Sequence, residues 1–242
     1  MKINMKVGID KKICFEWLEL TAFNFIETRD VKETRKMLDL QIEPILKGSE
    51  SRRKVITILK GIWLDIDNEV LDLRDRALDM MPTLSREERL LVQWGMIMVT
   101  YPFFKDLNTY IGRLLSIQGE FTLEQVYARV VEKYGEKGTL KYAVQRAISG
   151  IEEWGVLVRG DKKGIYKPVD KKIDIYNEEL ILWFIEACIR TTENKSMQFD
   201  NLFSMPCLYP FNIDFNIDSV RKSDKICMNR IGVNIDVVEL SN

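Results

Sequence analysis

Residues 121–169 decide the fold of this chain: FTLEQVYARVVEKYGEKGTLKYAVQRAISGIEEWGVLVRGDKKGIYKPV. Thr122 and Gln125 have the spacing of a capping box, in which each side chain bonds the other residue's backbone N–H at the start of a helix. Apolar residues then recur at helical spacing until Gly135, which ends the run. Thr139 can cap a second helix with one apolar face. The stretch therefore begins with two short helices joined by a glycine-bearing turn.

A strand, a turn and a second strand follow these two helices. Residues 154–159 indicate a turn and a strand, residues 160–164 a tight turn with two lysines, and residues 165–169 a returning strand. Two helices followed by a hairpin predict a winged helix-turn-helix.

The outward face of the second helix carries side chains that can contact base edges in the major groove of DNA. They are Lys141, Tyr142, Gln145, Arg146 and Ser149. The hairpin adds cations that would hold phosphates, namely Arg159, Lys162, Lys163 and Lys167. The alternative is a winged helix that binds proteins, on which these lysines would only form a solvated face.

The charge of this region differs from that of the whole chain. Between Lys133 and Lys172 there are ten basic and five acidic residues, a local net charge of +5, whereas the 242-residue chain has a net charge of −1. A local basic patch in a near-neutral protein is typical of an electrostatic footprint for nucleic acid.

A second basic group lies near the N-terminus, at Arg52, Arg53 and Lys54. Ser49 or Ser51 could cap the helix in which they lie, which would place three cations in its first turn. Cations there oppose the helix dipole, so these residues are candidates for phosphate contacts. Ordinary solvated charge is the alternative interpretation.

The remainder of the chain predicts a mainly α-helical protein with a small C-terminal sheet. We expect a helical bundle over residues 1–118, the winged helix over 119–172, and a C-terminal α+β part over 173–242. The expected helices cover residues 12–25, the segment after the possible cap Asp30, 86–100, 107–117 and 178–189. The helix over 86–100 should be the buried centre of the bundle, and the helix over 178–189 should pack the winged helix against it or form a self-association surface. Alternating residues over 211–217 and 231–237 predict strands of an antiparallel sheet.

Composition excludes several classes of protein. The longest apolar stretch, Leu90 to Phe104, is shorter than the roughly 20 residues of a membrane helix, and the N-terminus has no apolar signal segment, so we expect a cytoplasmic protein. Four dispersed cysteines and the absence of histidine disfavour a metal site and His-based catalysis. The cysteines are expected to be small buried apolar residues.

The chain contains no glycine-rich phosphate loop and no positive sign of an enzyme, so we expect no catalytic residues, no metal and no cofactor. A metal-dependent nuclease would need carboxylates close to a lysine. Asp214, Asp218 and Lys222, or Asp161 with Lys163, come nearest to that pattern, and turn chemistry explains both sets better. The carboxylates between Asp65 and Asp79 are expected to form a solvated helix face.

The segment Ser49-Glu50-Ser51-Arg52-Arg53, followed by a buried helix that leads into Phe103-Phe104, resembles the BrxA family of accessory proteins in BREX phage-defence islands. The resemblance covers roughly residues 15–120. It implies a non-enzymatic protein that binds double-stranded DNA beside a methyltransferase and other defence components. It supplies no catalytic residues.

The first hypothesis is thus a DNA-binding protein without enzymatic activity. A protein–protein adaptor that uses its winged helix as a scaffold in a multi-subunit complex is the second, and a transcriptional regulator that senses a ligand is a third. The sequence does not indicate an oligomeric state or a DNA sequence preference.

Overall fold

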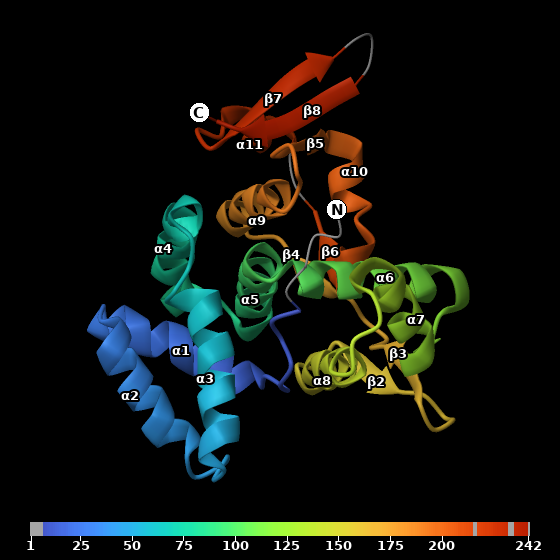
Figure 1. Ribbon diagram of the computed structural model, residues 1–242. Helices are drawn as coiled ribbons and strands as arrows, with labels where there is room; N and C mark the ends of the chain where they lie inside the picture. Colours follow the sequence, from blue (N-terminus) through green and yellow to red (C-terminus); the bar gives the residue numbers. More distant parts are fainter. Residues whose placement is uncertain (1–6, 215–216, 232–234, 242) are drawn as a thin grey trace.

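The computed structural model describes residues 7–214, 217–231 and 235–241. The chain is mainly helical and ends in a small antiparallel sheet (Figure 1). The first five helices form a bundle: α1 (Phe15–Thr28), α2 (Val31–Ile42), α3 (Ser49–Trp63), α4 (Leu71–Met80) and α5 (Arg86–Thr100). Two short 3-10 turns, η1 (Asn68–Val70) and η2 (Met81–Thr83), flank α4.

Side-chain caps start two of these helices, the first of them at the predicted cap Asp30. The Asp30 carboxylate accepts a hydrogen bond from the Glu33 N–H at 2.8 Å and begins α2. Ser85 and Glu88 form a complete capping box at the start of α5. Each cap satisfies N–H groups that lack a partner inside the helix.

Helix α5 is the centre of the core, as predicted, and Trp94 lies at its middle. Every residue from Leu90 to Met98 is buried. The Trp94 ring packs edge-on against four rings from other parts of the chain, those of Phe104, Trp154, Tyr209 and Phe211, at centroid distances of 5.0–6.1 Å. One side chain therefore joins the bundle to the two regions that follow it.

A second group of elements follows α5. It consists of α6 (Pro102–Gln118), β1 (Phe121–Thr122), α7 (Leu123–Tyr134), α8 (Leu140–Glu153), β2 (Leu157–Arg159) and β3 (Ile165–Pro168). The strands form an antiparallel sheet in the order β1-β3-β2. Phe121 of β1 stacks on Tyr166 of β3 with ring centroids 5.4 Å apart.

Two features of this group differ from the expectation. Helix α6 begins at Pro102 rather than at residue 107, because a proline is well suited to the first position of a helix, where its missing N–H has no partner to lose. Strand β1 was not predicted. It has two residues, too few for an alternating pattern.

The C-terminal part contains α9 (Glu178–Arg190), α10 (Phe199–Phe203), η3 (Pro206–Leu208) and α11 (Ile217–Lys222). Strands β5 (Ser196–Gln198), β8 (Ile235–Leu240) and β7 (Ile226–Ile231) form the terminal antiparallel sheet in that order. The prediction of a strand over 211–217 was wrong in part: β6 (Phe211–Ile213) pairs in parallel with β4 (Ile173–Ile175), and Ile217 begins α11. Of the positions that suggested strands, Phe215 and Val233 lie outside the described residues.

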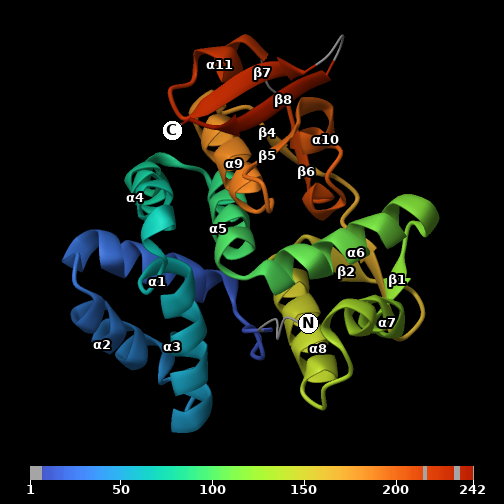
Figure 2. The same cartoon turned by 45° about the horizontal axis from the view of Figure 1, so that its top comes forward.

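The bounds of helix α9 agree with the predicted 178–189 to within one residue, but its packing partners differ from the expected ones. It packs on α5 and α4 and supports β8, so it joins the bundle to the terminal sheet rather than to the 121–169 region. Figures 1 and 2 show α9 between α5 and the terminal sheet in both views. In the part of the chain that the structure covers, no helix combines the length and the apolar character needed to cross a bilayer.

Ile13 and Phe15, just before α1 and at its first position, hold the C-terminal end of α8 against the bundle. The Trp154 indole N–H donates to the Ile13 carbonyl at 2.9 Å, and the Phe15 N–H donates to the Glu153 carboxylate at 3.0 Å. These two contacts orient α8 relative to α1.

Candidate nucleic-acid interface

Helix α8 has the two faces that the sequence predicts. Its apolar residues Leu140, Val144, Ile148 and Ile151 are buried. The predicted polar face is open to solvent. Ser149 is half-buried, and the other four residues are exposed, namely Lys141, Tyr142, Gln145 and Arg146. The predicted cap was wrong, because the Thr139 side chain makes no capping hydrogen bond and its backbone is already helical.

Among the described residues, no carboxylate lies within ion-pair distance of Lys141 or Arg146. The same is true of Lys162 and Lys163 in the turn between β2 and β3, both of which are exposed. Cations without a carboxylate partner can neutralise the phosphates of a nucleic-acid backbone.

The other two cations of the hairpin have carboxylate partners. Arg159 makes two hydrogen bonds to Glu152 of α8, at 2.6 and 3.2 Å, and these raise the pKa of the guanidinium. Lys167 lies 3.3 Å from Asp161 and 3.8 Å from Glu120. Arg159 therefore braces the hairpin against α8. Lys162 and Lys163 are the hairpin cations that have no carboxylate partner among the described residues.

The structure assigns Arg52 a different role from the one expected. Its side chain is buried and donates to Asp39 at 2.6 Å, to Glu43 at 3.2 Å, and to the carbonyl groups of Leu46 and Lys47. These partners occupy the guanidinium, which closes the turn between α2 and α3 and cannot serve as an exposed phosphate contact.

Arg53 and Lys54 are exposed, as expected, but both pair with Glu50 of the same helix, at 3.0 and 3.4 Å. Helix α3 begins at Ser49 with Gly48 as its N-cap, so the predicted serine caps were wrong. Glu50 lies in the first turn and offsets the unfavourable interaction of the two cations with the helix dipole.

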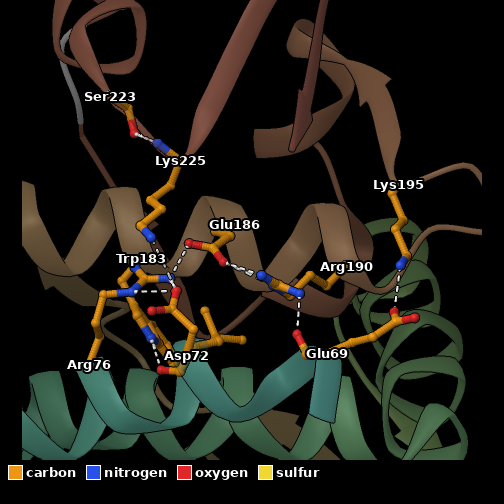
Figure 3. Close-up of polar contacts among 10 residues, drawn as sticks. Glu69, Asp72, Arg76, Trp183, Glu186, Arg190, Lys195, Ser223 and Lys225 are labelled. Atoms are coloured by element: carbon orange, nitrogen blue, oxygen red, sulfur yellow. Dashed lines mark hydrogen bonds and ion pairs between the residues drawn. The ribbon is translucent and has the colours of Figure 1, made fainter. Parts of the chain in front are cut away.

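A cluster of charged residues that the sequence analysis missed lies between α4 and α9 (Figure 3). The Glu186 carboxylate is 2% exposed and pairs with Arg76 of α4 and with Arg190 of α9. Toward the solvent, Glu69 pairs with Lys195, and Asp72 pairs with Lys225 at 3.4 Å. The signal was the single glutamate in the otherwise apolar run ILWFIEACI, because a glutamate buried among such residues is usually paired.

Burial lowers the reactivity of two of the four cysteines. It raises the pKa of the Cys207 thiol to about 11 and that of Cys188 well above its ordinary value. Cys14 is half-buried, whereas Cys227 is exposed, so the expectation that all four are buried was wrong for Cys227. No group of three or more cysteine, aspartate or glutamate side chains with the geometry of a metal site occurs within the described ranges.

Comparison with known proteins adds no relative: no family model, curated protein or solved structure matches the chain.

Proposed function

We propose that residues 119–172 form a winged helix that binds double-stranded DNA, with α8 as the recognition helix and the turn between β2 and β3 as the wing. The observation that carries this proposal is the open polar face of α8, together with Lys162 and Lys163 of the turn; among the described residues, no carboxylate pairs with the cations of either group. The element order α6-β1-α7-α8-β2-β3, with β3 in the middle of the sheet, supports it.

The side chains of α8 suit the major groove. The groove is about 12 Å wide and admits a helix, and arginine and glutamine can each bond two atoms of one base. We assign base contacts to Gln145 and Arg146, and support from Lys141, Tyr142 and Ser149 at the edges of the groove. The apolar opposite face holds α8 in place, so the helix binds without losing its own packing.

The wing contacts phosphates in this proposal through Lys162 and Lys163. Arg159 and Lys167 would have to exchange a protein carboxylate for a phosphate, so we expect them to contribute less. The resemblance to the BrxA family is the reason to place this activity in a bacterial phage-defence system, as an accessory DNA-binding component without enzymatic activity.

A protein-docking role is the second candidate, and exposed apolar side chains favour it. Tyr142 on α8 is 65% exposed, Val158 on β2 44%, and Ile117 at the end of α6 81%. Aromatic and aliphatic groups in such positions are typical anchors in protein interfaces.

One experiment separates these two roles: fluorescence anisotropy measures binding to a labelled DNA duplex at two salt concentrations. The variants are Lys141→Ala/Arg146→Ala on α8 and Lys162→Ala/Lys163→Ala on the wing. The matched control is Arg221→Ala/Lys222→Ala, which removes the same charge from α11 at the opposite end of the molecule (Figures 1 and 2).

Our proposal expects both test pairs to weaken binding and the control to leave it nearly unchanged. Removing one cation that neutralises a phosphate should reduce the slope of log K against log salt by about 0.9. Absence of binding at low salt would contradict the proposal and favour protein docking. If DNA binding weakened equally in all three variants, the interaction would depend on the net charge of the protein and not on a particular site.

A further inference from the structure

A basic groove runs between α2 and α3, outside the interface described above. It encloses about 580 Å³. Six cations and one carboxylate line it, with Ile56 and Thr57 among the other lining residues. The cations are Lys32, Arg35 and Lys36 from α2, and Arg52, Arg53 and Lys60 from α3. Arg52 is occupied by Asp39 and Glu43, and Lys60 pairs with Asp65 at 2.7 Å, so the four exposed cations Lys32, Arg35, Lys36 and Arg53 are the ones that an anionic ligand would contact.

The cations on the α2 side are available. Lys32 and Arg35 are exposed and make no ion pair within the part of the chain that the structure describes. Within the described ranges, Lys36 pairs with Glu33 at 3.1 Å and Arg53 with Glu50 at 3.0 Å, each on its own helix. Exposed pairs of this kind contribute little, so a phosphate can replace the carboxylates at small cost.

The chemistry of the groove favours a phosphate backbone over a nucleotide. Among the described residues that line it, none is aromatic, so a base would have no ring on which to stack. The only carboxylate, that of Asp39, already accepts a hydrogen bond from Arg52. Cations on two facing helices can instead contact several phosphates along a strand.

Figures 1 and 2 both show the α2–α3 hairpin at the same end of the molecule as α8, with residues 7–14 between α3 and α8. Lys11 of that segment and Arg146 of α8 line one small hollow together with Ile62 of α3. A polyanion in contact with α8 could therefore pass over Lys11 toward α3.

We propose that the α2–α3 groove holds the phosphodiester backbone of the DNA duplex bound by α8, beyond the base pairs that α8 contacts. This inference rests on the proposed function. It extends the contacts from one helical turn of DNA to a longer segment, and it makes the α2–α3 hairpin a sequence-independent clamp.

The test compares two duplex lengths, one of about 12 base pairs, little more than a helical turn, and one of about 30. The variant Lys32→Glu/Arg35→Glu changes the groove. The control Arg221→Glu/Lys222→Glu makes the same charge change on α11. Both pairs are exposed, so neither should disturb folding, which circular dichroism checks.

The groove variant should bind the short duplex like the wild type and the long duplex roughly tenfold more weakly, with a salt slope lower by about 2 on the long duplex only. Unchanged binding of the long duplex, or a weakening equal to that of the control, would overturn the inference. Poly-glutamate serves as a second ligand. If the groove variant lost poly-glutamate binding but bound the long duplex like the wild type, the inference would be overturned and the groove would be assigned to an acidic protein partner.

The variant Lys141→Ala/Arg146→Ala separates this inference from the proposed function. If it weakens binding to the short duplex while the groove variant has no effect on the long one, only the groove is refuted. If it has no effect on the short duplex while the groove variant weakens the long one, the recognition-helix proposal is refuted and the groove stands as the main DNA contact.

Discussion

Arg52 closes the turn between α2 and α3 from inside the protein, whereas its neighbour Arg53 lies on the surface. We predict that Arg52→Ala lowers the melting temperature clearly, because the variant lacks the buried donor that bonds Asp39, Glu43 and the carbonyl groups of Leu46 and Lys47. Arg53→Ala removes the same charge and should change the melting temperature little. Thermal unfolding followed by circular dichroism measures both, and equal shifts would contradict the structural role of Arg52.

Glu88 in the capping box of α5 should make stability depend on pH. The Ser85 N–H lowers the pKa of this carboxyl below its usual 4.5 by bonding the charged form, against the effect of burial. The pKa is depressed in the folded state, so the stabilisation is present above pH 4.5 and is lost as the pH falls through the folded value.

Glu88→Gln tests this prediction. The free-energy difference between wild type and variant should be largest near pH 7 and should shrink below about pH 4. Urea unfolding at both pH values measures it. A difference that stays constant across this range would show that the charge of Glu88 does not matter.

For single residues, the sequence predicts contacts between near neighbours in the chain and misses contacts between distant ones. The boxes Ser85/Glu88 and Thr122/Gln125 were predictable because donor and acceptor lie three residues apart. The burial of Arg52 was not, because Asp39 and Glu43 reach it only when α2 folds back on α3.

One buried glutamate, Glu186, contributes to the contact between helices α4 and α9, beside the hydrogen bond from the Trp183 indole N–H to the Leu73 carbonyl. Glu186→Ala should lower the free energy of unfolding by about 3 kcal/mol, because it leaves Arg76 and Arg190 without their shared carboxylate. Glu69→Ala, at the exposed end of the same cluster, is the matched control. Urea unfolding of both variants measures the effect, and equal small decreases would mean that water replaces the buried carboxylate.

Whole elements were predictable where the apolar period was long and the ends were marked. Helix α5 begins and ends where the sequence predicts, since a capping box precedes it and Pro102 follows it. The alternating residues near 211 led to the wrong prediction of an antiparallel strand, because alternation does not indicate whether a strand pairs in parallel or which strand is its partner. The outward face of α8 was predicted correctly, but the partners of Arg159 and Lys167 come from the three-dimensional arrangement of the hairpin.

One continuous core extends through the whole molecule. Trp94 touches rings of α6, of the C-terminal end of α8 and of the region around 210, so its surroundings report on all three expected parts of the chain. We predict a single cooperative unfolding transition rather than three. Near-ultraviolet circular dichroism of the tryptophans and far-ultraviolet circular dichroism of the helices should have coincident midpoints.

Separate transitions would contradict this prediction and would show that residues 119–172 are an independent domain. The division at 118 and 172 remains a prediction from composition and pattern. The sequence could not reveal that α6 packs against α7 and β1 on one side and against α5 and η3 on the other, because long-range packing leaves no local signature.

The bonds from Ile13 and Phe15 to Trp154 and Glu153 have a consequence for the order of events during synthesis. They join residues 141 and 138 positions apart, so α8 cannot be fixed to the bundle until most of the chain has left the ribosome. The proposed recognition helix acquires its final orientation late, and a nascent chain that stops before residue 154 should have a helical bundle without a positioned α8.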